Sequence, residues 1–543
     1  MSDNEVSAEN TAQAATNAAQ EAASTDTAPE KANAAAAAAD AKPAKQYPTK
    51  QPKGLFWLFG AEAWERFSYY GMRAILVLFL VNQLQFTREN ALALYGVYTG
   101  LVYLTPLLGG FLSDRILGAR KAIIIGGCTM ALGEMCLAFP ELLYTGLALL
   151  ILGNGFFKPN ISNIVRGLYE EGDPRRDGGF TIFYMGINLG AFFSPLVCGT
   201  LGQMFGWKYG FIAAGLGMII GQLVFNIGQK HYGNAGYPPE MGEVPAGTKL
   251  RGKDIADIFI YIGGIIGIVW LADVIWKHAC PSLSQPLVIG VIIFILATIA
   301  LGFIYKGAVP AKEETKAEDN SNEKMFAGFS VSEWQRIAVI LIMTFFVIFF
   351  WMGFEQAGGT MTLFADQNTD RTVFGWEIPS SWFQSINPFV IVAFAPLFSM
   401  LWFHWDQSKY RLSTPLKMAL GLFMLGLGFV IMFTASKIAA NGTLVGPLWL
   451  TSVYFVHTMG ELCLSPVGLS MVSKLAPQRL MSVMMGFWFL SSAVANYMAG
   501  KLEAFLNNYQ INMWYFLIIS SICASVALIA LNPILKKWMH GRA

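Results

Sequence analysis

The sequence predicts an all-α membrane protein whose helices cross the bilayer many times. Hydrophobic residues make up 55% of the 543-residue chain and charged residues only 13%, with a mean hydropathy of +0.47. A soluble chain carries roughly 25% charged residues. Apolar blocks recur from about residue 55 onward, and basic residues gather in alternate connections between them. These three observations together predict a polytopic membrane fold.

Each apolar block is long enough to form a membrane-spanning helix, which needs about 20 residues. The fourteen predicted spans are 55–83, 91–113, 121–140, 143–166, 179–203, 208–228, 254–276, 285–306, 332–365, 381–403, 414–436, 446–473, 480–505 and 511–535.

Basic residues orient these spans, because cytoplasmic connections carry an excess of Lys and Arg. Alternate connections hold isolated basic residues, such as Arg88, Lys208 and Arg371. The other connections and the C-terminal tail hold the clusters, which are Arg115–Lys121, Arg166–Arg176, Lys230–Lys253, Lys306–Lys324, Lys409–Arg411, Lys474–Arg479 and Lys536–Arg542. This pattern predicts that both termini lie in the cytoplasm.

Two long polar connections bracket the seventh and eighth spans, which predicts a helix pair inserted between two six-helix halves. Two halves of this kind are typical of bundles that rock about a central site. The predicted domains are an Ala-rich cytoplasmic tail without stable structure over 1–50, an N-terminal six-helix bundle over 51–230, a linker with the inserted pair over 231–330, and a C-terminal six-helix bundle with a short tail over 331–543.

Several charged residues fall inside the predicted spans, where each costs roughly 2.5–3.5 kcal/mol at the bilayer centre. Four carboxylates and three cations are assigned to this depth: Glu62, Glu65, Glu355, Glu461, Arg66, Arg73 and Lys158. Because four carboxylates cannot all pair with three cations, at least one is expected to hold a proton. A protonated carboxylate beside a cation that can change partners is suited to proton coupling. Static ion pairs that hold the helices together are the alternative.

A polar stripe on the first span predicts that this helix lines an aqueous cavity. Glu62, Glu65, Arg66 and Tyr69 fall within one quadrant of the helix at about 100° per residue. Cations on the N-terminal half and Glu461 on the C-terminal half suit the two ends of a zwitterion. Further candidate cavity residues are the amides Asn188 and Asn387 and the aromatic residues Tyr103, Tyr184, Trp351 and Trp488. Packing alone would also explain each aromatic residue. Prolines at 159, 195, 388 and 466 are expected to break helices near these groups.

Three long motifs carry a family resemblance. They are Glu62-x-x-Glu65-Arg66-Phe67-x-Tyr69-Tyr70-Gly71-Met72-Arg73, Phe183-Tyr184-Met185-Gly186-Ile187-Asn188-Leu189-Gly190-Ala191, and Gly460-Glu461-Leu462-x-Leu464-Ser465-Pro466. Phe157–Asn160 and Ser385–Pro388 agree with them, and the loop Gly110–Lys121 resembles a cytoplasmic loop of the major facilitator superfamily (MFS). The chain therefore resembles the proton-dependent oligopeptide transporters (POT, or PTR) of the MFS over about residues 50–536, with the inserted pair typical of bacterial members.

The resemblance implies an MFS fold with twelve core helices and two inserted helices. It implies inward symport of di- and tripeptides with protons, across the inner membrane of a bacterium. The roles that it implies are contact with the peptide carboxylate for Arg66 and Lys158, contact with the amino end for Asn188, Asn387 and Glu461, pocket positions for Ser465 and Trp488, proton coupling for Glu62, Glu65 and Glu355, and closure of the outer gate for Arg73.

One position departs from the family pattern. Gly96 stands where animal members carry a histidine that is thought to handle protons. Proton coupling in this chain is therefore expected to rest on carboxylates.

Other functions fit the sequence less well. The five histidines show no metal-ligand spacing, no nucleophile motif stands out, and no phosphate-binding Gly-Lys-Ser/Thr loop is present, which disfavours an enzyme or an ATP-driven pump. A nitrate or other anion carrier is disfavoured by the intramembrane carboxylates. A passive membrane sensor would have no use for the charge stripe. We expect no cofactor other than the coupled proton, no nucleic-acid partner, and a monomer in the lipid bilayer.

Overall fold

The computed structural model describes residues 47–170, 172–237, 252–279, 325–326, 329–407, 412–477 and 480–542. The helices belong to one compact unit, Pro52–Ala543. The predicted tail over 1–50 lies outside the described residues, apart from its last four positions. The predicted span 285–306 also lies outside them.

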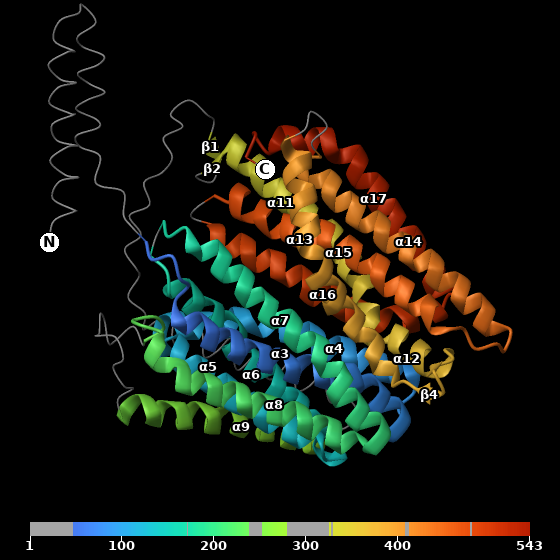
Figure 1. Cartoon of the computed structure of the whole chain (residues 1–543), viewed down its shortest axis with the longest axis horizontal. Helices are drawn as coiled ribbons and strands as arrows, with labels where there is room; N and C mark the ends of the chain where they lie inside the picture. The colour runs from blue at the N-terminus through green and yellow to red at the C-terminus, as the bar shows by residue number, and fades with distance from the viewer. Residues whose placement is uncertain are drawn as a thin grey trace, which may run out of the picture. The chain divides into compact units, whose positions relative to one another are not determined.

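Six helices make up the N-terminal half, shown in blue to green in Figure 1. They are α3 (Lys53–Leu78), α4 (Arg88–Leu112), α5 (Ala119–Leu137), α6 (Leu143–Gly167), α7 (Arg175–Thr200) and α8 (Trp207–Gly228). The inserted helix α9 (Gly252–Ala279) follows. A π-helical turn, Phe79–Gln83, prolongs α3, so this helix covers the whole of the first predicted span.

The C-terminal half is drawn in yellow to red in Figure 1. Its helices are α11 (Val331–Phe354), α12 (Thr360–Gln367), α13 (Ile386–Gln407), α14 (Thr414–Ala440), α15 (Pro447–Leu475), α16 (Met481–Asn507) and α17 (Met513–Trp538). A 3₁₀ turn, Glu355–Gly358, separates α11 from α12 and divides the predicted span 332–365.

The strands are short and lie between helices. β1 (Met325–Phe326) pairs with β2 (Phe329–Ser330), and β3 (Thr372–Val373) pairs with β4 (Trp376–Glu377), both antiparallel. The second hairpin lies in the connection between α12 and α13. The fold of the described residues is therefore almost entirely helical, as predicted.

Ten helical segments among the described residues are long and apolar enough to cross a membrane. Helices α3, α5 and α16 are not among these ten segments. On α3 the reason is visible in the sequence, because Glu62, Glu65, Arg66 and Arg73 all lie on this one helix. The residues that lower its hydropathy are the ones predicted to line the cavity.

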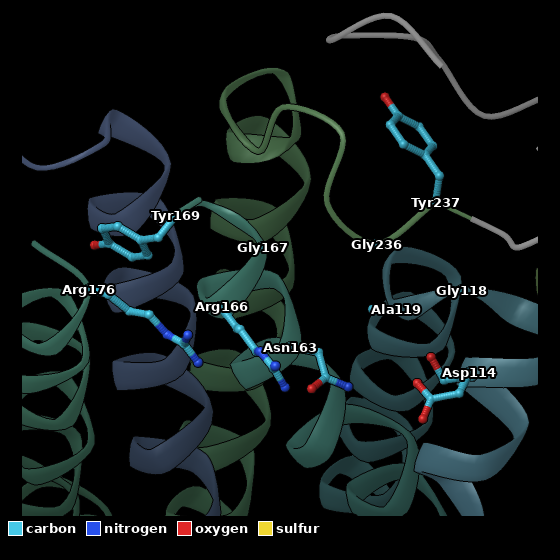
Figure 2. Close-up of a pocket in the computed structure, with 11 residues that line it drawn as sticks. Asp114, Gly118, Ala119, Asn163, Arg166, Gly167, Tyr169, Arg176, Gly236 and Tyr237 are labelled. Atoms are coloured by element: carbon cyan, nitrogen blue, oxygen red, sulfur yellow. The ribbon is translucent and has the colours of Figure 1, made fainter. Parts of the chain in front are cut away.

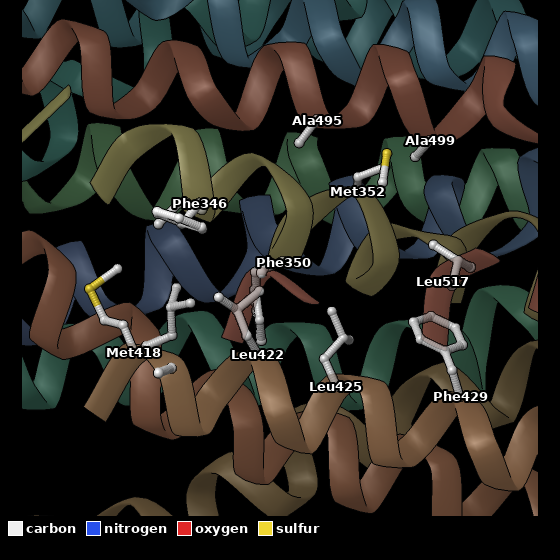
Figure 3. Packing of buried hydrophobic residues seen from close by; sticks show 14 of the residues in the cluster. Phe346, Phe350, Met352, Met418, Leu422, Leu425, Phe429, Ala495, Ala499 and Leu517 are labelled. Atoms are coloured by element: carbon white, nitrogen blue, oxygen red, sulfur yellow. The ribbon is translucent and has the colours of Figure 1, made fainter. Parts of the chain in front are cut away.

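Each half has its own apolar core. In the C-terminal half, Phe346 and Phe350 of α11 pack with Leu422 and Phe429 of α14, and all are buried (Figure 3). A separate cluster of buried residues fills the N-terminal half between α3, α4, α5, α6 and α8. The buried apolar residues of the two halves thus form largely separate clusters, with Leu363 of α12 joining the N-terminal one.

Helix α9 packs against α5 and α6 of the N-terminal half. Ile258, Ile265 and Val269 of α9 are buried in this contact. An ion-pair group fixes it at one end, where Lys121 Nζ lies 3.1 Å from Asp254 Oδ1 and 2.9 Å from Asp257 Oδ2. The side chains of Lys121 and Asp254 are almost completely buried.

The prediction that prolines break helices is wrong at three of the four positions. Helices α6, α7 and α15 run on through Pro159, Pro195 and Pro466. Pro388 stands in the first turn of α13, where its missing N–H costs no helical hydrogen bond.

Candidate functional site

The stripe predicted on the first span is a buried cluster on α3. Arg66 Nη2 donates to Glu65 Oε1 at 2.7 Å, Arg66 Nε also contacts Glu65 Oε2, and Arg66 Nε lies 3.2 Å from Glu62 Oε1. The Arg66 guanidinium carbon lies 5.4 Å from the centre of the Tyr69 ring. Helical spacing brings these four residues together, because side chains at i, i+3 and i+4 share a face. We call this set the α3 stripe.

Lys158 of α6 is the second predicted cation of the N-terminal half. Its ammonium lies 4.4 Å from the centre of the Tyr103 ring on α4, which is a cation–π contact. Among the described residues, no carboxylate lies within ion-pair distance of it. Lys158 still interacts electrostatically with Glu62, Glu65 and Glu355. Lys158 is therefore a cation without a fixed carboxylate partner.

Arg73 joins the two halves. Its Nη2 contacts Oε2 of Glu355, which begins the 3₁₀ turn after α11, and both side chains are buried. Its Nε donates to the hydroxyl of Tyr95 on α4 at 2.5 Å. Sequence reasoning placed Arg73 and Glu355 at membrane depth but did not pair them, because partners 282 residues apart leave no local signal.

Glu461 of α15 and Asn387 of α13 meet within the C-terminal half. Asn387 Nδ2 donates to Glu461 Oε2 at 2.8 Å and to Thr458 Oγ1 at 3.0 Å. Ser465 follows one turn later on α15. Glu461 also interacts electrostatically with Tyr70 and Tyr184 of the N-terminal half. The hydrogen bond that Glu461 makes joins α13 and α15 within the C-terminal half.

Three predicted site residues keep a buried polar atom without a partner among the described residues. These atoms are Glu62 Oε2, the Tyr69 hydroxyl and Ser465 Oγ. Buried polar groups in proteins almost always have a hydrogen-bond partner, so these atoms are candidates for contact with water or a ligand. They occur on both halves, on α3 and on α15.

The remaining predicted site residues, Asn188, Tyr184, Trp351 and Trp488, make contacts mainly within their own helices or with neighbouring helices. Asn188 is buried and donates to the Tyr184 carbonyl one turn earlier on α7, whereas the Tyr184 side chain is exposed. Trp351 packs edge-on against Phe350 and Phe354. Trp488 is buried and packs against Gly468 of α15.

Sequence reasoning missed Glu134, a fully buried carboxylate on α5. Its Oε1 accepts a long hydrogen bond of 3.4 Å from Ser68, and its Oε2 has no partner among the described residues. It also interacts electrostatically with Glu65. The sequence did offer a signal, since Glu134 is a carboxylate inside an apolar predicted span. Glu134 is a fifth buried carboxylate beside the four that were predicted, Glu62, Glu65, Glu355 and Glu461.

Polar contacts between the two halves cluster at one end of the helices. Arg88 of α4 pairs with Glu503 of α16 at 2.6 Å, and Trp382 Nε1 donates to Thr200 Oγ1 at 2.9 Å. Arg73 and Glu355 lie at the same end. We call this set of contacts the closed end.

Gly96 serves a close helix contact. A Cβ at this position would lie 2.7 Å from the Gly500 Cα on α16 and 2.9 Å from the Asn496 carbonyl oxygen. A real Cβ does not approach backbone atoms so closely, so a histidine here would push α4 and α16 apart. The departure from the animal pattern thus has a packing reason.

The fold and these paired charges can be set beside known proteins. The model of the POT family matches residues 120–244 and 272–518. The chain belongs to the POT family. "Uncharacterized transporter YclF" of Bacillus subtilis is 36% identical over 90% of the chain and 95% of its own length. "Peptide transporter YePEPT" of Yersinia enterocolitica is 34% identical over 89% of the chain and 94% of its own length. "Dipeptide and tripeptide permease A" of Klebsiella pneumoniae is 31% identical over 83% and 84%.

Solved structures of POT proteins share the fold. The peptide transporter POT in complex with sulfate is 34% identical, with a TM-score of 0.73 over 91% of this chain and 97% of its own. The tetrameric PepTSo2 is 25% identical, with a TM-score of 0.66 over 89% and 98%. This POT chain is therefore a polytopic membrane transporter with an MFS-type fold. Because the related PepTSo2 is tetrameric, the monomeric state expected for this chain stays a prediction.

Proposed function

We propose that this POT protein is a symporter that imports di- and tripeptides together with protons by alternating access. The observation that carries the proposal is the arrangement of unpaired polar atoms and charges on facing halves. The α3 stripe and Lys158 lie in one half, and Glu461 and Ser465 lie in the other. The names of two relatives, a peptide transporter and a dipeptide and tripeptide permease, supply the substrate class.

A small peptide is a zwitterion whose ends suit the two halves. Lys158 has no fixed carboxylate partner among the described residues, so it is available to a peptide carboxylate. At the opposite side Glu461, held by Asn387, is available to the peptide ammonium. The peptide backbone can then satisfy the unpaired Tyr69 hydroxyl and Ser465 Oγ. Binding of both ends draws the two halves together.

The proton enters the proposal through Arg66. This guanidinium is shared between Glu62 and Glu65. When one carboxylate takes up a proton, it loses its charge attraction for Arg66, which is then free to join Lys158 at the peptide carboxylate. Glu355 holds Arg73 across the halves, and its protonation would release the closed end in the same way. Proton uptake and peptide binding are thereby linked.

Orientation completes the proposal. With both termini in the cytoplasm of a bacterium, the closed end faces outward, because α3 ends and α4 begins there. The contacts made by Arg73 and Arg88 then form the outer gate. With this gate closed, peptide would be released toward the cytoplasm.

Competition during uptake tests the substrate class. Purified protein is reconstituted in proteoliposomes, and uptake of a labelled dipeptide is measured with unlabelled tripeptide or nitrate in excess. Tripeptide is expected to suppress uptake and nitrate to leave it unchanged. Suppression by nitrate alone would contradict the proposal and favour an anion carrier.

A further inference from the structure

A second cavity lies away from the proposed peptide site. It is an open cavity of about 650 Å³, lined by residues of the N-terminal half at the ends of α4 and α6, at the beginnings of α5 and α7, and in the segment after α8. On α6 it starts five residues beyond Lys158 with Asn163, which is about 7.5 Å along the helix. The cavity is thus near the membrane surface and at the end opposite to the closed end.

Two arginines dominate the lining. Figure 2 shows the side chains of Arg166 and Arg176 extending in the same direction, with the Asn163 amide next to Arg166. Neither guanidinium has an ion-pair or hydrogen-bond partner among the described residues. Asp114 is the one carboxylate among the lining residues, and it has an interaction of its own. The cavity therefore presents two uncompensated positive charges.

A buried hydroxyl also lines the cavity. Ser113 is only 1% exposed, and it is one of the residues that line the cavity. A serine hydroxyl can donate a hydrogen bond to an anion that binds beside it. Ser113 is independent of the arginines, because it comes from the turn after α4 and they come from α6 and α7.

The opposite half does not offer the missing negative charge. Lys474, in the last turn of α15, is basic and exposed. Asp406, at the end of α13, is already bound to Lys417 at 2.7 Å. Among the described residues of this half, no free carboxylate is therefore available to pair with Arg166 and Arg176.

We propose that this cavity binds a phosphate group through Arg166, Arg176 and Ser113. Paired guanidinium groups recognise phosphate through several N–H donors at once, and a serine hydroxyl supplies a further donor. The cavity is large enough for a phosphate with its substituent. Basic pockets between helices at the cytoplasmic surface bind phospholipid headgroups, and a free phosphate compound presents the same chemistry.

Thermal stability measures binding to the full-length protein. In detergent, sodium phosphate is titrated against sodium chloride of equal ionic strength. In a second arm, the protein is placed in bilayers of phosphatidylglycerol or of phosphatidylcholine. A saturable rise in Tm with inorganic phosphate identifies a soluble phosphate as ligand, and a higher Tm in phosphatidylglycerol alone identifies a lipid headgroup.

Variants assign the response to the cavity. The double variant Arg166→Gln with Arg176→Gln is expected to weaken phosphate binding, followed by the rise in Tm, by at least about tenfold. The reason is that charge-assisted contacts to two guanidinium groups are lost. The matched control, Lys230→Gln with Lys474→Gln, removes the same charge from exposed positions outside the cavity. Arg166→Lys with Arg176→Lys keeps the charge, and is expected to fold and to bind with intermediate strength.

The proposal is overturned if the wild type responds to neither phosphate nor phosphatidylglycerol. It is also overturned if the arginine variants respond as the wild type does. Because the readout is Tm and not uptake, either result leaves the proposed peptide transport intact.

Discussion

Arg73 on α3 and Glu355 at the end of α11 form a buried ion pair that joins the two halves of the transporter. Tyr95 holds the same guanidinium from α4. The pair exists because a 3₁₀ turn ends α11 at Glu355, which brings this carboxylate to the interface. In the proposed alternating-access mechanism, protonation of Glu355 would weaken this contact between the halves.

Glu355→Gln tests this role. The amide keeps the shape of the side chain but neither attracts Arg73 by charge nor carries a proton. We expect proton-driven uptake to fall by roughly tenfold or more, because truncating one partner of a buried charge pair costs 2 kcal/mol or more. Exchange of labelled for unlabelled peptide without a gradient should persist.

Glu377→Gln is the matched control for this variant. Glu377 is exposed and pairs with Arg371 at 2.7 Å within one half. It should leave both uptake and exchange unchanged. Normal proton-driven uptake by Glu355→Gln would remove Glu355 from the coupling mechanism.

Glu461→Gln tests recognition of the peptide amino end. Asn387 should still hold the side chain, but the charge that attracts an ammonium is lost. We expect uptake of peptides with a free amino group to fall roughly tenfold to a hundredfold. Competition by an N-acetylated peptide should change little. Wild-type apparent affinity for the free peptide would show that Glu461 lies outside the site.

Lys158→Ala tests whether Lys158, which has no fixed carboxylate partner, binds the peptide carboxylate. Its loss leaves Arg66 alone to meet the peptide carboxylate, so gradient-driven uptake should be abolished. Lys437→Ala is a suitable control, since Lys437 also contacts an aromatic ring, that of Phe433 at 5.4 Å, but near the end of α14. An active Lys158→Ala transporter would show that Lys158 has a structural role.

Asp254→Asn tests the attachment of the inserted helix. Asp254 is fully buried beside Lys121, whereas Asp257 is partly exposed. Breaking a buried ion pair costs about 3–5 kcal/mol, and we expect the lower end of this range because Lys121 keeps Asp257. The Tm of the purified protein should therefore fall clearly for Asp254→Asn and less for Asp257→Asn. Equal, small decreases would show that this group contributes little to the attachment of α9.

Local patterns made the fold and much of the candidate site predictable from the sequence. Charged residues in an apolar helix are costly, so Glu62, Glu65 and Arg66 stood out in the sequence. Helical spacing alone predicted that they share one face of the helix. Apolar periodicity and length likewise predicted the helical spans. The contacts of Arg66 with both glutamates agree with that spacing.

Relationships between distant segments were not predictable in this way. The pairing of Arg73 with Glu355, and of Arg88 with Glu503, depends on how the two halves meet. Glu134 was missed because a lone carboxylate, without a motif around it, did not stand out from the apolar span. The prolines were misjudged because neighbouring helices can support a helix that runs through proline.

Proton-driven accumulation of peptide tests the central claim most directly. Proteoliposomes with the purified protein are given a labelled dipeptide, with the outside either more acidic than the inside or at the same pH. Symport predicts accumulation above the external concentration only with the inward proton gradient, and its loss when a protonophore is added. Equal uptake with and without the gradient would contradict the account.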